Sequence, residues 1–333
     1  MNLFRHLLIL ILPVLFIHGS PPGEETAIFQ NKTIVIDPGH GGTAATDSFR
    51  VGPDGEREEW INLRVATYLK EMLAEKGARI IMTRSEDSAV GLKERALLAI
   101  ENDADVLVSI HHNATADTAV NFPIVYFHAN ASENQASVQL GKTLIKYINK
   151  TMYSDSTPVS LVSDHVIFPG SGTAVLRHSY GIPGVIGEAS FFTNPAEEQR
   201  LKNKAYNKKE ARAYFLALQE YFQHSAPPII EKNSLIEVSL FSVLQEADRM
   251  SDIARLWRQN FERGLKLYQS KKQDSLQQAL HLFTRSARSF PDSWLAPKAH
   301  YYRYKILKKL GESKKAEETR QRLEEFYPLC NYK

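Results

Sequence analysis

The feature that most limits the folds open to this chain is an alternation of short β-branched runs with amphipathic stretches, which begins at Thr33. Residues 33–37 and 79–83 are predicted to be strands. Between them, residues 58–76 carry apolar side chains at helical spacing, and Gly77 can take the left-handed conformation that ends a helix. Because a strand, a helix and a second strand in this order are typical of βαβ units, we predict an α/β domain.

The same alternation continues as far as about residue 221. Further strands are predicted at residues 105–110, 123–127 and 184–188, further helices at 92–101, 132–149 and 195–221, and a loop at 164–173. Several strands are almost continuously apolar, which indicates that helices cover both faces of the sheet. The predicted fold is therefore a twisted, mostly parallel sheet flanked by helices, followed by a small all-α C-terminal domain.

A proline pair at Pro227 and Pro228 marks the boundary between these two parts, because paired prolines stiffen a linker and end a helix. We predict a first domain at residues 31–223, a linker at 224–243 and a helical domain at 244–330. Within the helical domain, an alanine precedes an aromatic-proline pair twice, with an offset of 37 residues between the copies. This period is close to the roughly 34 residues of a tetratricopeptide unit, so the domain resembles such helical hairpins. We expect it to bind a protein partner or to pack against the first domain.

The first twenty residues have the layout of a signal peptide, with Arg5 before an apolar run at residues 7–17. The alternative, a membrane anchor, is disfavoured because a span needs about 20 apolar residues. We predict a signal peptide at residues 1–20, export, and no stable membrane span.

Two features of the composition limit the chemistry. Cys330 is the only cysteine, so the chain forms no internal disulfide. For the same reason, any zinc site in this chain would have to be made of histidine and carboxylate side chains. The formal charge of +3 at pH 7 is too balanced to indicate a nucleic acid partner.

Two histidines follow two of the predicted strands directly. His40 comes after the strand at 33–37, and His111 comes after the strand at 105–110. Because ligand sites in open α/β sheets lie at the carboxyl ends of strands, these imidazoles can converge on one ion. His112 points to the opposite face if the strand persists, so we expect it behind the site or exposed.

Several carboxylates are candidates for the same site. Glu58 and Glu59 both lie at the start of the helix at 58–76. The unpaired backbone N–H groups at a helix start favour a carboxylate there even if it has no role in a metal site. Asp37 either orients His40 or caps a turn. Glu188 ends the strand at 184–188, and the residues alone do not pair it with a metal.

Five motifs in order over residues 33–221 resemble the zinc-dependent N-acetylmuramoyl-L-alanine amidases of the type called amidase 3. They are Asp37-Pro-Gly-His-Gly-Gly42, Arg57-Glu-Glu-Trp-Ile-Asn-Leu63, Thr83-Arg84 with Asp87, Leu92 and Arg95, Ser109-Ile-His-His-Asn113, and Pro183 to Glu188 with Phe192, Asn194 and Glu197. The resemblance implies Zn²⁺ as cofactor, held by His40, Glu58 and His111, with Glu188 as general base. Together with the signal peptide, it implies export to the periplasm or cell envelope of a bacterium.

The resemblance also implies the reaction, which is hydrolysis of the amide between the lactyl group of N-acetylmuramic acid and L-alanine in peptidoglycan by zinc-activated water. Arg177 is a candidate to hold a peptide carboxylate, or else it is a surface arginine. His165 and His178 are predicted to be structural or to face solvent. Departures at His112 and at the residues flanking Glu188 bear on substrate preference. The alternatives are another zinc peptidase of the wall, or a catalytically silent wall-binding or activator protein.

Overall fold

The computed structural model describes residues 24–45, 50–233, 236–244, 246–270 and 273–330. The predicted signal peptide, residues 1–20, lies outside the described residues. Within the described ranges, none of the helices combines the length and the hydropathy that a bilayer crossing requires.

Strands and helices alternate through the first two thirds of the chain, as predicted. Their bounds are α1 Glu24–Phe29, β1 Thr33–Pro38, α2 Glu58–Ala74, β2 Arg79–Met82, α3 Leu92–Glu101, β3 Val106–Asn113, β4 Ile124–Phe127, α4 Gln135–Met152, β5 Ser160–Ser163, the 3₁₀ turn η1 Asp164–Val166, α5 Ala174–His178, β6 Gly184–Phe191, α6 Pro195–Leu201 and α7 Lys204–Phe222.

The described strands form one six-stranded sheet in the order β2-β1-β3-β6-β4-β5. The pairs β1–β2, β1–β3, β3–β6 and β4–β5 are parallel, and only β4–β6 is antiparallel. The predicted α/β class and mostly parallel sheet are therefore confirmed. Because β1, β3 and β6 run in the same direction, the residues at their carboxyl ends meet at one edge of the sheet.

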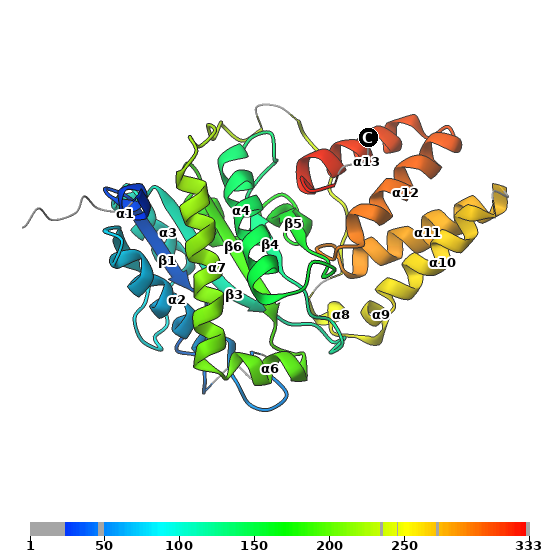
Figure 1. Cartoon of the computed structure of the whole chain (residues 1–333). Helices are drawn as coiled ribbons and strands as arrows, with labels where there is room; N and C mark the ends of the chain where they lie inside the picture. Colours follow the sequence, from blue (N-terminus) through cyan, green and yellow to red (C-terminus); the bar gives the residue numbers. More distant parts are fainter. Residues whose placement is uncertain (1–23, 46–49, 234–235, 245, 271–272, 331–333) are drawn as a thin grey trace, which may run out of the picture.

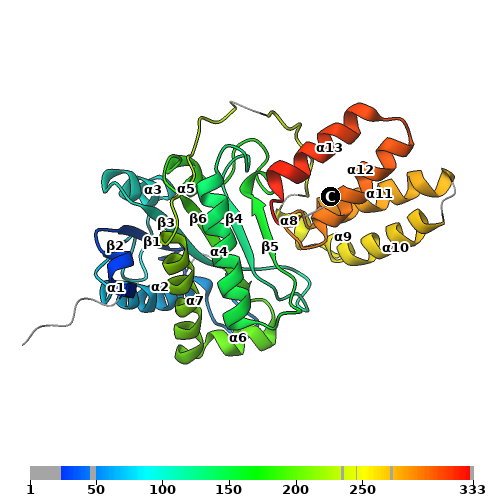
Figure 2. The same cartoon turned by 45° about the horizontal axis from the view of Figure 1, so that its top comes forward.

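Helices cover both faces of the sheet, which explains why its strands are almost continuously apolar (Figures 1 and 2). On one face, α2, α4 and α7 pack against side chains such as Ile34, Val108 and Val185 in a single core. On the other face, Val35, Leu107 and Ile186 belong to a second core, which continues into the C-terminal helices. Alternate residues of a strand enter opposite cores, as the pleat of a strand requires, except beyond the irregular pairing of β3 and β6 after Glu188, where Phe191 enters the second core.

Several local predictions were wrong. The strand predicted at residues 105–110 continues to Asn113, so His111 lies inside β3 rather than after it. The strand predicted to end at Glu188 continues to Phe191, so Glu188 lies inside it. The predicted helix at 195–221 is two helices, because the Asn203 side chain accepts a hydrogen bond from the amide of Ala205 and starts α7. The edge strand β5 and the short helix α5 were not predicted. Four or five residues are too few to show a clear period.

The C-terminal part is all helical, with α8 Glu246–Arg249, α9 Asp252–Arg255, α10 Trp257–Gln269, α11 Gln273–Ser289, α12 Ala296–Lys309 and α13 Ser313–Phe326. These helices lie beside the β4–β5 side of the sheet (Figures 1 and 2). Phe122 packs between Phe191, Phe290 and Trp294, which joins the two parts through aromatic contacts. An all-α C-terminal region is confirmed, whereas its tetratricopeptide character stays a prediction.

Candidate metal centre and active site

His40, Glu58 and His111 converge at the carboxyl ends of β1 and β3. Nε2 of His40 lies 3.1 Å from Oε2 of Glu58, and Nδ1 of His111 lies 3.1 Å from Oε1 of the same carboxylate. The two imidazole rings meet edge to face with their centroids 4.7 Å apart. These three side chains form one of the groups in the described residues whose ligand atoms are close enough to share an ion.

The loop after β1 is shaped so that both imidazoles fit. A Cβ on Gly39 would lie only 2.2 Å from Cε1 of His111, so the ring occupies the space that any larger residue would fill. His40 itself has a positive φ of 59°, which is uncommon for a residue with a side chain and is typical of functional sites. Arg84 Nη2 donates to the carbonyl of Gly39 at 2.9 Å, and Arg95 Nη2 donates to that of His40 at 2.6 Å. The two guanidinium groups hold this loop in place.

Asp37 does not orient His40, so that alternative was wrong, and it does not act as a simple turn cap either. Its buried carboxylate accepts hydrogen bonds from Thr83 Oγ1 at 2.6 Å, Arg95 Nη1 at 2.7 Å and Ser109 Oγ at 2.6 Å. Burial would raise the pKa of Asp37, but Arg95 and the two hydroxyl groups outweigh burial and lower it. Asp37 therefore anchors Arg95, which in turn holds the loop.

Glu58 is oriented by the first turn of α2 and by β3. Asn62 Nδ2 donates to Oε1 of Glu58 at 3.1 Å, and the backbone N–H of His112 donates to the same oxygen at 3.2 Å. Glu59 instead accepts a hydrogen bond from Arg57 Nε at 2.6 Å. The two adjacent glutamates therefore point to different partners, and Glu58 is the one that faces His40 and His111.

Electrostatics favour the metal-binding protonation states of Glu58 and His40, but not of His111. Burial would lower the pKa of His111, but its hydrogen bond to Glu58 and the nearby carboxylates outweigh burial and raise it. Burial would raise the pKa of Glu58, but the charges and hydrogen bonds of His40 and His111 hold it well below its usual range. Burial lowers the pKa of His40 despite the neighbouring Glu58 carboxylate, which favours the neutral imidazole. A charged carboxylate beside a neutral imidazole is the form in which both bind metals.

Glu188 lies on β6 directly opposite His111 on β3. Burial raises the pKa of Glu188 to about 7, although the nearby His111 lowers it. Its Oε2 atom is buried and accepts no hydrogen bond from the described residues. Glu188 as a whole is half-buried. A carboxylate whose buried oxygen is free, opposite one of the three convergent side chains, is suited to accept a proton near neutral pH.

His112 lies on the opposite face of β3, as strand alternation predicted, and it is buried rather than exposed. Its Nδ1 lies 2.8 Å from Oδ1 of Asn62, and its Nε2 lies 3.1 Å from Oε2 of Glu210 on α7. Sequence reasoning missed Asn62 and Glu210 as supports of this centre. Asn62 lies one helical turn after Glu58, a spacing that could have drawn attention to it.

The structure does not bring Arg177 to this centre. Arg177 lies on α5, before β6 begins, and its Nη1 donates to the carbonyls of Ser171 at 2.9 Å and Gly172 at 3.0 Å. Glu188 lies four residues into β6, toward the other end of the sheet. The predicted role of Arg177 in holding substrate is therefore not supported by its position. His178 on the same helix is exposed, as predicted.

A second group of possible ligands, His128, Asp164 and His165, lies elsewhere in the described residues. Lys232 Nζ lies 3.2 Å from Nε2 of His128, and Asp164 accepts hydrogen bonds from both the amide and the hydroxyl of Thr173. His128 Nδ1 lies 2.9 Å from Asp164 Oδ2. Because a lysine already lies against this group and its oxygens are hydrogen-bonded, we interpret it as a structural network.

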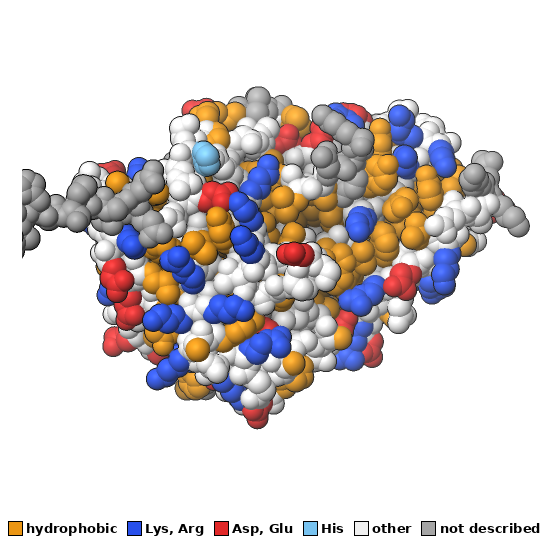
Figure 3. Space-filling view, viewed as in Figure 1, with side chains coloured by type: hydrophobic (Ala, Val, Ile, Leu, Met, Phe, Trp, Pro, Cys, Tyr) orange, Lys and Arg blue, Asp and Glu red, His pale blue; other side chains and the backbone are white. Residues whose placement is uncertain are grey.

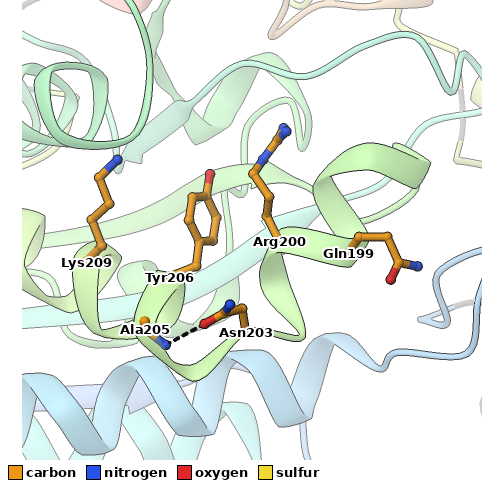
Figure 4. Close-up of a pocket in the computed structure, with 6 residues that line it drawn as sticks. All are labelled: Gln199, Arg200, Asn203, Ala205, Tyr206 and Lys209. Atoms are coloured by element: carbon orange, nitrogen blue, oxygen red, sulfur yellow. Dashed lines mark hydrogen bonds between the residues drawn. The ribbon is translucent and has the colours of Figure 1, made fainter.

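A pocket of about 440 Å³ lies where α6 and α7 meet (Figure 4). It is lined by Gln199, Arg200, Asn203, Ala205, Tyr206 and Lys209. Arg200 and Tyr206 both donate hydrogen bonds to the buried Glu197 carboxylate. The pocket includes none of the convergent ligands, so it is not the reaction centre.

Comparisons with known proteins agree with this arrangement. A family model described as N-acetylmuramoyl-L-alanine amidase matches residues 34–220. The chain is 30% identical over 203 residues to the uncharacterized protein YqiI of Bacillus subtilis, covering 61% of this chain and 91% of that protein. It is 28% identical over 193 residues to the probable cell wall amidase LytH of Staphylococcus epidermidis, covering 58% of this chain and 59% of that relative.

Among solved structures, the CwlD amidase of Clostridioides difficile in complex with the GerS lipoprotein is similar, with a TM-score of 0.50 and 26% identity. That match covers 58% of this chain and 99% of the other. The residues matched by the family model include His40, Glu58, His111 and Glu188 and make up more than half of the sequence. The chain therefore belongs to the N-acetylmuramoyl-L-alanine amidase family.

Proposed function

We propose that this protein is a zinc-dependent N-acetylmuramoyl-L-alanine amidase that hydrolyses the amide between the lactyl group of N-acetylmuramic acid and L-alanine in peptidoglycan. The observation that carries the proposal is the convergence of His40, Glu58 and His111 beside Glu188. Family membership supports the reaction class, and the names of the relatives support the cell wall as the place of action.

The side chains at this centre fit zinc. Two imidazoles and one carboxylate form a common ligand set for catalytic zinc, which leaves a position for water and substrate. The free, buried Oε2 of Glu188 is an acceptor that a water molecule at this position could satisfy. When bound, zinc would lower the pKa of a water molecule and polarise the scissile carbonyl.

Glu188 supplies the proton transfers of the reaction. Its carboxylate takes a proton from the attacking water as the new carbon–oxygen bond forms, and it returns this proton to the leaving amine as the carbon–nitrogen bond breaks. Its pKa of about 7 is suited to both steps at neutral pH. Asn62 and His112 act as positioning residues, because they hold the carboxylate of Glu58.

The remaining assignments are also proposals. Residues 1–20 direct export, residues 31–223 form the catalytic domain, residues 224–243 form a linker and residues 244–330 form the helical domain. The match to the CwlD amidase covers 99% of that protein and 58% of this chain, so its complex with the GerS lipoprotein bears on the amidase part alone. A protein partner at the helical domain is a proposal that rests on its resemblance to stacked helical hairpins.

Replacing Glu188 with glutamine tests the proposed reaction. The variant should retain zinc, because Glu188 is not a proposed ligand, and should lose turnover by about 100-fold or more. The matched control is Glu101→Gln, at an exposed position on α3. Mass spectrometry of digested peptidoglycan should show intact stem peptides released from glycan. Release of single amino acids would indicate a peptidase instead, and an unchanged rate in Glu188→Gln would refute the role of Glu188.

A further inference from the structure

Charge is distributed very unevenly along this chain, although the total is nearly balanced. Residues 244–333 contain 19 Lys and Arg against 11 Asp and Glu, a formal charge of +8. Residues 1–243 contain 22 Lys and Arg against 27 Asp and Glu, a formal charge of −5. A basic helical part joined to an acidic catalytic part indicates an anionic partner for the helices.

The lysines of α12 gather on one side of that helix. Lys298, Lys305, Lys308 and Lys309 are all exposed, and their spacing places them on the same broad face. The opposite face carries Ala299, Ile306 and Leu307, which are buried against neighbouring helices. We call Lys298, Lys305, Lys308 and Lys309 the α12 lysine face. Figure 3 shows that blue basic side chains alternate with orange side chains over the C-terminal helices.

Tyrosine rings hold three of these ammonium groups in place. Lys305 lies 5.1 Å from the ring centroid of Tyr301, Lys308 lies 5.6 Å from that of Tyr304, and Lys309 lies 4.6 Å from that of Tyr268. Cation–π contacts restrict a long side chain but leave its charge unneutralised. Because these lysine side chains are already restricted, an anion that binds here loses less free energy to side-chain ordering than one that binds unrestricted lysines.

Three acidic groups at the start of α13 and within it are paired with basic residues of α13 itself. Glu317 and Glu324 on α13 both bind Arg320, and Glu312 binds Lys315. By contrast, no ion pair within the described residues involves Lys298, Lys305, Lys308 or Lys309. The positive charge of the α12 lysine face is therefore available to bind an anionic ligand from outside the chain.

We propose that the α12 lysine face binds the carboxylate-bearing stem peptides of peptidoglycan, away from the reaction centre, and so retains the enzyme on its polymeric substrate. This inference rests on the proposed function, which identifies the polymer. A membrane surface is the less suitable partner, because none of the exposed large apolar side chains of the helical part lies on α12, where it could insert into lipid beside the lysines. Those side chains are Met250, Ile253, Leu256 and Leu329.

The test compares two sets of four substitutions in full-length Glu188→Gln protein, so that the wall material is not digested. The first set changes the α12 lysine face to glutamine. The matched control set changes four exposed lysines on α2, α3 and α4, namely Lys70, Lys93, Lys142 and Lys150. Both sets remove the same charge, and thermal melting checks that both remain folded. Cosedimentation with purified peptidoglycan sacculi measures retention.

We expect the first set to weaken retention by about tenfold or more, because each lysine near an anionic surface contributes a factor of about five. The control set should change retention much less. Retention should also fall in about 1 M salt, where the Debye length is about 3 Å. Equal retention by the two sets would overturn the proposal, as would binding of the parent protein to phosphatidylglycerol vesicles but not to sacculi.

A separate assay keeps this proposal distinct from the proposed function. With Glu188 restored, the first set should cleave soluble muramyl peptides as fast as the parent protein and should digest sacculi more slowly. Lysine-dependent retention without cleavage of soluble fragments would refute the amidase activity and leave wall binding standing. Normal cleavage of soluble fragments with unchanged retention would refute wall binding by the α12 lysine face and leave the amidase activity standing.

Discussion

A single methyl group at Gly39 should disable the reaction centre. In Gly39→Ala, the new Cβ would lie 2.2 Å from Cε1 and 2.3 Å from Nε2 of His111, whereas ordinary contacts begin at 3.4 Å. Gly39 is not among the residues with positive φ, so alanine meets no backbone strain there. The imidazole of His111 must therefore move by about 1 Å or the loop must shift, because the backbone of Gly39 is held by β3.

The size of the effect follows from this displacement. A zinc–nitrogen bond is about 2.0–2.1 Å long, so a ligand displaced by about 1 Å no longer binds at full strength. Changes to residues that merely support a metal ligand weaken metal binding by about 10- to 100-fold, or about 1.4–2.7 kcal/mol, and we expect at least this loss. Misplacement of this size also lowers kcat/KM by about 100-fold.

The assay measures zinc content, kcat/KM on soluble peptidoglycan fragments and the melting temperature. Gly91→Ala is the matched control, because its Cβ would meet only the side chain of Glu94, at 3.8 Å. We expect Gly39→Ala to lose zinc and activity while Gly91→Ala retains both. If Gly39→Ala bound zinc and turned over like the control, His111 would not lie where the structure places it.

Three further changes test the surroundings of the centre. Arg95→Ala leaves Asp37 buried without its charged partner and should cost about 3–5 kcal/mol in urea denaturation; a loss below about 1 kcal/mol would contradict the pairing. Because the pKa of Asp37 is lowered in the folded state, its carboxylate contributes stability above about pH 4 that is lost as the pH falls through the folded pKa. Asp37→Asn should remove this acid dependence from the unfolding free energy. Tyr126→Phe removes the hydroxyl that donates to the buried Asp292 and should cost about 1–3 kcal/mol, measured in the same way.

How far the sequence predicts this centre depends on whether a general rule of the fold connects a residue with its partner. His40 follows β1 and His111 lies near the carboxyl end of β3, and the rule that parallel strand ends meet was sufficient to bring them together. The choice of Glu58 over Glu59 needed the family resemblance, because both lie in the first turn of α2. The link between Asp37 and Arg95 joins residues 58 positions apart, and no local pattern indicates it.

The C-terminal helices were predicted as helices, but their relation to the reaction centre was not. Glu188 and Ile186 point to the same face of β6, because side chains alternate along a strand, and Ile186 belongs to the core shared with Phe290 and Trp257. Tyr126 is paired with Ile186 on the neighbouring strand, and its hydroxyl donates to Asp292 between α11 and α12. The proline pair therefore marks a change in sequence pattern rather than a division between two cores. Removing the helices would expose to water the same sheet face from which Glu188 projects, and burial is the largest cause of its raised pKa. A catalytic domain cut at residue 243 should accordingly lose the environment that suits Glu188 to proton transfer, even if the three ligands stay together.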